Sequence, residues 1–146
     1  MAKNERSVRD VMTANPVTVS EKDSIRDVAR IMAREDTGVV PVVDGKKIIG
    51  MITDRDIVVR LVAEGKECSN AKVNEAMSKN VRSVREDASV NEVLELMKSA
   101  EIRRVPVVNQ NQELVGIVSI GDVAQTNRDG KVGETVEKIS QAPPNN

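Results

Sequence analysis

The sequence predicts an α/β (α+β) protein made of two copies of one β-α-β-β-α unit. Three observations lead to this fold class. The chain of 146 residues repeats itself at a nearly constant spacing, each copy carries a helical apolar pattern followed by two continuous apolar runs, and aliphatic side chains supply nearly all of a 39% hydrophobic fraction. Because one copy is too small to bury both faces of its sheet, we expect the two to pack sheet to sheet about a pseudo-twofold axis.

The internal repeat extends over most of the chain. "VRDVMTANPVTVSEKDSIRDVARIM" aligns with "VNEAMSKNVRSVREDASVNEVLELM", which makes Met12 equivalent to Met77 at a spacing of 65 residues. One additional residue in "NQNQE" increases the spacing to 66, so that Gly50 is equivalent to Gly116. The predicted organisation is a first unit at 7–65, a linker at 66–71, a second unit at 72–127 and a partly disordered C-terminal tail at 128–146.

Each copy begins with a short strand and a helix. The stretch "PVTV" supplies the strand in the first copy and "VRSV" supplies it in the second. The helix that follows is indicated by apolar residues at the i, i+3, i+4, i+7 spacing of a single helical face. These residues are Ile25, Val28, Ala29 and Met32 in the first copy, and Val90, Val93, Leu94 and Met97 in the second.

Two longer strands and a short helix complete each copy. The strands are "VVPVV" and "KIIGMIT" in the first copy, and "RVPVV" and "ELVGIVS" in the second. Asp44-Gly45 is a strong hairpin signal between the first pair, and residues 109–112 form a looser turn in the second. In the first copy Ile57, Val58, Leu61 and Val62 predict the closing helix, and Gly65 is well placed to end it.

The last strand of each copy runs directly into a Ser/Thr-x-x-Asp motif, Thr53/Asp56 and Ser119/Asp122. Alone, this motif indicates a capping box at a helix start, and seven other matches occur in the chain. These two differ because they lie at the carboxyl end of an apolar strand, where ligands collect in α/β proteins. Aspartate is too short to close the box as well as glutamate does, so we expect its carboxylate to point outward and to accept hydrogen bonds from a ribose diol.

The stretches "PVVDGKKIIGMITDRDI" and "RRVPVVNQNQELVGIVSIGDV" resemble the two halves of a CBS-domain pair, also called a Bateman module. The resemblance covers about Ser7 to Val123 and is specific because the motif occurs twice. It implies a stand-alone, bacterial-type regulatory module without an effector domain of its own. Members bind adenosine compounds in clefts between paired units, regulate enzymes, channels or transporters, and commonly dimerise into a flat disc.

The resemblance also implies which residues form the two sites. Asp56 and Asp122 would accept from the ribose hydroxyls, with Thr53 and Ser119 beside the ribose or phosphate. Arg55 in the first copy could reach a phosphate, whereas Gly121 offers only its backbone amide. The remaining predicted site residues line the adenine or the same clefts: Val17, Gly38, Val39, Val40 and Pro41 in the first copy, and Arg82, Arg103, Arg104, Val105 and Pro106 in the second.

The ligand class follows from the residues available. With 0% aromatic residues, an adenine has to lie between aliphatic side chains and be recognised by backbone groups. Guanidinium groups suit phosphate bidentately and repel a sulfonium, which favours AMP, ADP or ATP over S-adenosylmethionine. The arginines could equally be solvated surface charges, or pair with Glu and Asp side chains across the module. No cofactor is expected besides such an adenine nucleotide.

Composition disfavours other classes of protein. A net charge of −1 and the absence of aromatic residues argue against nucleic acid, and no 18-residue apolar run predicts a membrane span. The absence of histidine and of a metal-ligand cluster argues against an enzyme. Cys68 is expected to be an exposed, incidental thiol, with a redox-linked dimer as the alternative. A cytoplasmic homodimer acting on an unknown effector protein is therefore predicted.

The competing hypothesis is a dimeric scaffold or protein-interaction module that binds no ligand. It requires apolar residues exposed on the closing helices, such as Val59.

Overall fold

A computed structural model of the chain describes residues 6–125 and forms two compact units, each with its own hydrophobic core. One unit consists of residues 16–81. The other consists of residues 82–125 completed by residues 6–15. We call them the 16–81 unit and the 82–125 unit. The tail predicted at 128–146 lies outside the described residues.

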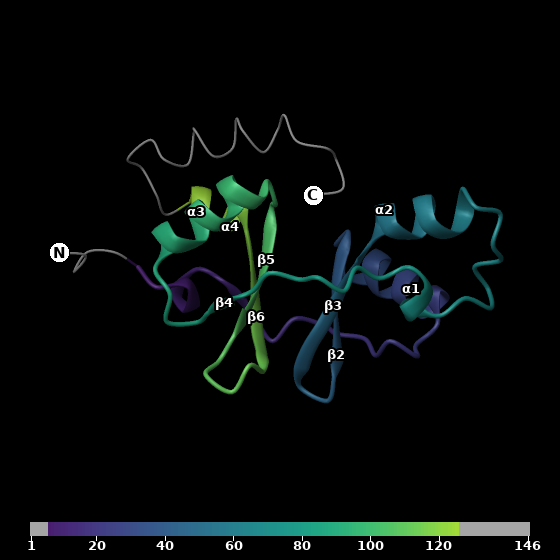
Figure 1. Cartoon of the computed structure of the whole chain (residues 1–146), viewed down its shortest axis with the longest axis horizontal. Helices are drawn as coiled ribbons and strands as arrows, with labels where there is room; N and C mark the ends of the chain where they lie inside the picture. The colour runs from purple at the N-terminus through teal and green to yellow at the C-terminus, as the bar shows by residue number, and fades with distance from the viewer. Residues whose placement is uncertain (1–5, 126–146) are drawn as a thin grey trace. The chain divides into compact units, whose positions relative to one another are not determined.

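The 16–81 unit contains one long helix, one hairpin and one closing helix (Figure 1). Its helix α1 spans Ile25–Glu35, begins at the cap residue Ser24 and ends at Asp36, which has a left-handed φ of 52°. Strands β2 (Val39–Asp44) and β3 (Lys47–Thr53) are antiparallel. Helix α2 (Asp54–Ile57) continues as a π-helical turn, η2 (Val58–Val62), and a short 3₁₀ helix, η3, covers Val73–Glu75.

The 82–125 unit repeats this pattern around a four-stranded sheet with the order β1-β6-β5-β4. Strand β4 (Val84–Arg85) is parallel to β5, and the other pairs are antiparallel. The remaining elements are α3 (Val90–Ala100), β5 (Arg104–Val108), β6 (Leu114–Ser119) and α4 (Ile120–Ala124), preceded in the chain by the 3₁₀ helix η1 (Val8–Asp10) and by β1 (Thr13–Ala14).

The predicted β-α-β-β-α order is confirmed in both copies, with two local differences. The first strand of the first copy is reduced to a single parallel bridge between Val19 and Val42. The closing helix of the first copy changes from α to π geometry after Ile57. As predicted, Gly65 stands at its end with a φ of 73°, and the Lys66 N–H donates to the Leu61 carbonyl at 2.9 Å.

Each compact unit contains a short segment from the other sequence repeat. Val8 and Val73 are equivalent positions, and both are 0% exposed. Val73 donates its N–H to Asp23 in the 16–81 unit, whereas Val8 donates its N–H to Ala88 in the 82–125 unit. Figure 1 shows the purple N-terminal segment beside the green β5–β6 hairpin. The compact units are therefore offset from the sequence repeats, and we call residues 6–14 and 71–78 the exchanged segments.

Candidate functional site

The predicted site residues of the first copy gather at one end of the 16–81 unit. Thr53 ends β3 directly opposite Val39, which begins β2. The N–H of Asp54 donates to the Gly38 carbonyl at 3.0 Å, which joins the start of α2 to the start of β2. Val17 lies two residues before the bridge to β2, at the same end, and is 38% exposed.

The Thr53/Asp56 motif forms a complete capping box. The Thr53 hydroxyl accepts from the Asp56 N–H at 3.0 Å, and the Asp56 Oδ2 accepts from the Thr53 N–H at 2.9 Å. The expectation that aspartate is too short for this role is therefore wrong, because the first helical turn brings the carboxylate back against the cap residue. Asp56 is only 8% exposed, and its second oxygen, Oδ1, lies outside the box at 3.9 Å from the Arg60 Nε.

The second copy repeats this geometry in the 82–125 unit. The Ser119 hydroxyl accepts from the Asp122 N–H at 3.1 Å, and the Asp122 Oδ2 accepts from the Ser119 N–H at 2.9 Å. The N–H of Ile120 donates to the Arg103 carbonyl at 2.8 Å, and Arg104 begins β5 opposite Ser119. Arg82 lies two residues before β4, which runs parallel to β5, so it belongs to the same end of the unit.

The valines that precede each proline have less free surface than the sequence indicated. Val40 is 1% exposed and Val105 is 0% exposed, and each lies in the core of its unit. Pro41 and Pro106 are buried as well. At these positions a ligand therefore cannot reach the aliphatic side chains that the sequence indicated.

Arg60 is a site neighbour that the sequence reasoning missed. Its Nη1 donates to the carbonyls of Ala76 and Met77 at 3.2 and 3.0 Å, while its Nε faces Asp56. It thereby joins the capping aspartate to an exchanged segment. The i, i+4 spacing from Asp56 was the only signal for this contact.

Cys68 differs from the expectation of an exposed thiol. It is half-buried and packs against the core of the 16–81 unit. A free cysteine packs as a small hydrophobic side chain, which fits this position beside the core.

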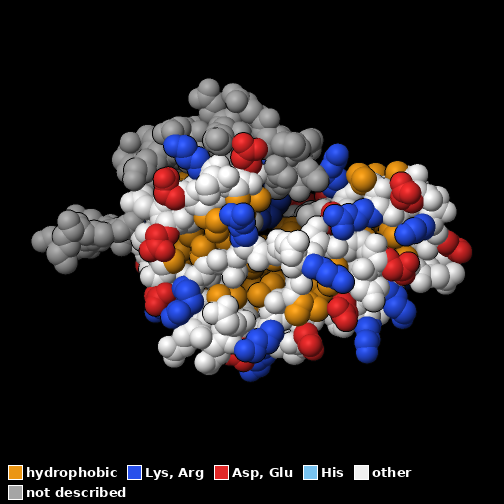
Figure 2. Space-filling view, in the orientation of Figure 1, with side chains coloured by type: hydrophobic (Ala, Val, Ile, Leu, Met, Phe, Trp, Pro, Cys, Tyr) orange, Lys and Arg blue, Asp and Glu red, His pale blue; other side chains and the backbone are white. Residues whose placement is uncertain are grey.

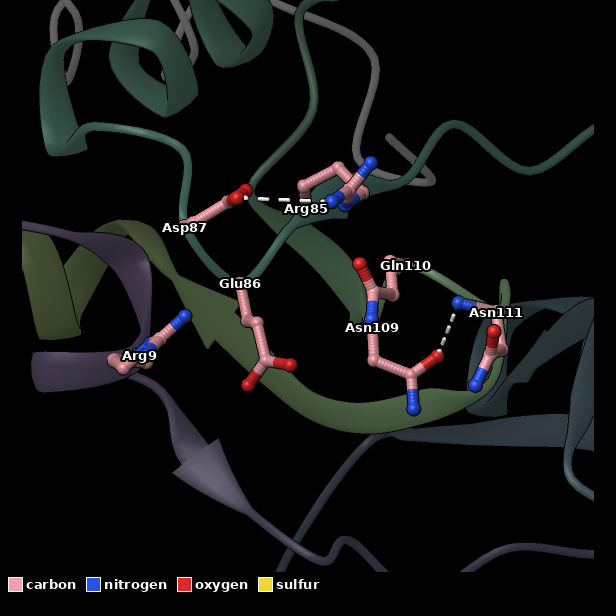
Figure 3. Close-up of a pocket in the computed structure, with 7 residues that line it drawn as sticks. All are labelled: Arg9, Arg85, Glu86, Asp87, Asn109, Gln110 and Asn111. Atoms are coloured by element: carbon pink, nitrogen blue, oxygen red, sulfur yellow. Dashed lines mark hydrogen bonds and ion pairs between the residues drawn. The ribbon is translucent and has the colours of Figure 1, made fainter.

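A polar pocket of about 360 Å³ opens elsewhere in the 82–125 unit (Figure 3). It lies at the opposite end of the β5–β6 hairpin from Ser119 and contains none of the predicted site residues. Arg85 is paired there with Asp87 at 3.6 Å, and the pocket holds as many acidic as basic side chains. Its lining residues are Arg9, Arg85, Glu86, Asp87, Asn109, Gln110 and Asn111.

The surface of the described residues is mixed in charge, with Lys and Arg side chains interspersed among Asp and Glu side chains on the face seen in Figure 2. Three exposed valines stand together on η2: Val58, Val59 and Val62 have exposed fractions of 55%, 44% and 57%. Among residues 6–125, no helix has the length and apolar character needed to cross a membrane.

Comparison with known families gives a match over both repeats. The model of the CBS domain matches residues 8–63 and again residues 73–128. The chain is 40% identical over 139 residues to the uncharacterised protein YlbB of Bacillus subtilis, a match that covers 92% of this chain and 91% of YlbB.

Solved structures with the same fold include proteins with different ligands. Hypoxic Response Protein I, solved with two coordinated zinc ions, is 34% identical with a TM-score of 0.77, covering 84% of this chain and all of that one. The CBS domain pair of MJ0100, solved with 5′-methylthioadenosine and S-adenosylmethionine, is 31% identical with a TM-score of 0.74, covering 83% and 94%. CBSX2 in complex with AMP is 22% identical with a TM-score of 0.73, covering 82% and 94%, and shows the fold alone.

Proposed function

Since the chain belongs to the CBS-domain family and carries the domain twice in tandem, we propose that it is a non-catalytic regulatory protein that binds adenine nucleotides. The sites are the two strand ends that carry Thr53/Asp56 and Ser119/Asp122. One observation carries this proposal. The same constellation of strand end, capping hydroxyl and aspartate recurs in both units with matching hydrogen-bond lengths.

The capping geometry leaves a suitable acceptor for a ribose. In each box one carboxylate oxygen is used by the cap residue, and the second oxygen lies outside the box. An ionised carboxylate oxygen accepts hydroxyl donors strongly. The capping bonds hold the aspartate in one orientation, so a ribose diol would meet an acceptor that is already in place.

Recognition of the base would rely on the backbone. The strand start at Arg104 would offer main-chain groups beside the Ser119/Asp122 box, whereas the N–H and the carbonyl of Val39 are already bonded to the Thr37 hydroxyl. The solved CBS domain pair of MJ0100, with 5′-methylthioadenosine and S-adenosylmethionine bound, supports an adenosine compound as the ligand.

The proposal is tested by thermal unfolding of the whole chain with AMP, ADP, ATP and S-adenosylmethionine. A ligand at 100 times its Kd is expected to stabilise the protein by about 2.7 kcal/mol per site. Asp56→Ala combined with Asp122→Ala is expected to abolish the shift. Ser24→Ala combined with Ser89→Ala is the matched control, because it removes two helix caps away from the sites. Undiminished binding by the aspartate variant would contradict the assignment.

A dimeric scaffold without a ligand is the second candidate function, favoured by the exposed valines of η2. Under that hypothesis none of the four compounds changes the unfolding temperature, whereas the mass in solution remains that of a dimer. We propose self-association through this face under both hypotheses. Regulation of a separate effector protein would then follow.

A further inference from the structure

The two proposed sites can be compared position by position because they occupy equivalent places in the repeat. Gly38 is replaced by Arg103, Val39 by Arg104, and Val17 by Arg82. The capping residues and the aspartates are kept. The two sites therefore differ in the charge of their side chains but share the same capping residues and aspartates.

In the 16–81 unit a carboxylate occupies the place of a side chain at position 38. A Cβ at Gly38 would lie 3.0 Å from the Asp54 Oδ2 and 3.3 Å from its Oδ1. The Asp54 Oδ1 also accepts from the Arg55 N–H at 2.8 Å, which fixes the carboxylate against Gly38. The glycine thus makes room for an acidic group at the edge of this site.

In the 82–125 unit the equivalent positions lose the acidic side chain and gain a basic one. Ile120 stands in place of Asp54, and Arg103 stands in place of Gly38. Arg82, Arg103 and Arg104 form no ion pair within residues 6–125. Their guanidinium groups remain available for an anion at this end of the unit.

The balance of charge separates the two sites. The first site has Asp54, Asp56 and Arg55, while Arg60 is engaged with Asp56 and two carbonyls. Asp122 is accompanied by three arginines in the second. A phosphate dianion would meet a fixed carboxylate in one site and free guanidinium groups in the other.

We propose that the two sites take different classes of adenosine compound. The site of the 82–125 unit binds the 5′-phosphorylated form, and the site of the 16–81 unit binds an adenosine compound without a 5′-phosphate, because Asp54 repels the phosphate. This inference rests on the proposed function and deepens it. It also reverses the expectation that Arg55 equips the first site better for phosphate.

The test is isothermal titration of the whole chain with AMP and with 5′-methylthioadenosine. AMP is expected to bind with one equivalent per chain. The AMP-saturated protein is expected to bind one further equivalent of 5′-methylthioadenosine. Two equivalent AMP sites, or full competition between the two compounds, would overturn the division alone. Absence of binding by both compounds would overturn the proposed function together with it.

Two reciprocal variants sharpen the assignment. Arg103→Gly combined with Arg104→Val gives the second site the residues of the first. This variant is expected to lower the affinity for AMP at least about tenfold, the loss typical of a charge-assisted hydrogen bond. Its 5′-methylthioadenosine affinity in the first site is expected to be unchanged. Asp54→Asn keeps the shape at position 38 and is expected to create a second AMP site.

Arg26→Ala is the matched control because Arg26 is an exposed arginine on α1, distant in sequence from both motifs. It changes the net charge as one site arginine does, and is expected to leave AMP affinity unchanged. An equal loss of AMP affinity in this control would show that total charge, and not the site, decides binding. Thermal midpoints of all variants report whether they remain folded.

Discussion

At the scale of single residues, the aspartates of the two motifs combine a structural and a proposed binding role. Asp56 and Asp122 each use one oxygen to close a capping box. Four of the seven other matches also make local contacts between a side chain and the backbone, namely those at Ser7, Ser20, Ser24 and Ser89. The motif alone therefore predicts a helix start, and its place at a strand end is what distinguishes a site.

Two glycines are required by close backbone contacts with the exchanged segments. A Cβ at Gly50 would lie 2.7 Å from the Ser78 carbonyl oxygen, and one at Gly116 would lie 2.9 Å from the Thr13 carbonyl oxygen. Gly50→Ala and Gly116→Ala are each expected to lower the free energy of unfolding by about 1–3 kcal/mol, because a backbone carbonyl has to move. Denaturant unfolding measures this loss.

Gly121→Ala is the control for these two substitutions. Its nearest neighbour is the Ser119 Oγ at 3.6 Å, an ordinary contact, and alanine favours a helix over glycine by about 1 kcal/mol. We expect unchanged or slightly raised stability. Equal destabilisation at all three glycines would show that the contacts with the exchanged segments are not the cause.

At the scale of elements, hydrophobic periodicity predicted most of the structure. Strand β3 spans the predicted "KIIGMIT", and α1 and α3 begin at the predicted Ile25 and Val90. The helix ends were not predictable, because Asp36 and Glu101 adopt left-handed conformations that usually indicate glycine. The sequence also did not predict the π turn of η2. A single π turn changes the spacing of the apolar residues too little to distinguish it from an α-helix.

The valines on η2 lead to a prediction about self-association. Val59→Lys combined with Val62→Lys would place two charges in an apolar interface and is expected to convert the dimer to a monomer. Size-exclusion chromatography with light scattering measures the mass. Ala33→Lys, on the exposed side of α1, is the control and is expected to leave the mass unchanged. A monomeric wild-type protein at high concentration would contradict the proposal.

At the scale of the whole molecule, the repeat predicted two similar units but not their composition. Sequence similarity aligns Val8 with Val73, yet each of these valines packs in the unit built mainly from the other repeat. Sequence similarity shows that the two repeats are related. It does not show which segments pack together, because residue spacing carries no information about those contacts. For the same reason, the sequence alone did not reveal that the Asp54 carboxylate lies beside Gly38.

A substitution in an exchanged segment is expected to lower the stability of a unit whose other residues are distant in the sequence. Val8→Ala is expected to remove about 2 kcal/mol of core packing and to increase amide exchange in β5 and β6. Val73→Ala is expected to have the same effect on β2 and β3. Hydrogen–deuterium exchange followed by mass spectrometry separates the two patterns. Faster exchange near β2 in the Val8 variant would contradict this assignment.

Along the sequence, residues 16–81 lie between the two parts of the other unit. This order determines which unit can be completed first during synthesis on the ribosome. Residues 16–81 are contiguous, so that unit has all its strands as soon as they leave the exit tunnel. Thr13, in contrast, is made before that unit and pairs with Ile117, which is made after it. Strand β1 therefore lacks its partner strand β6 until the whole of the 16–81 unit has been synthesised.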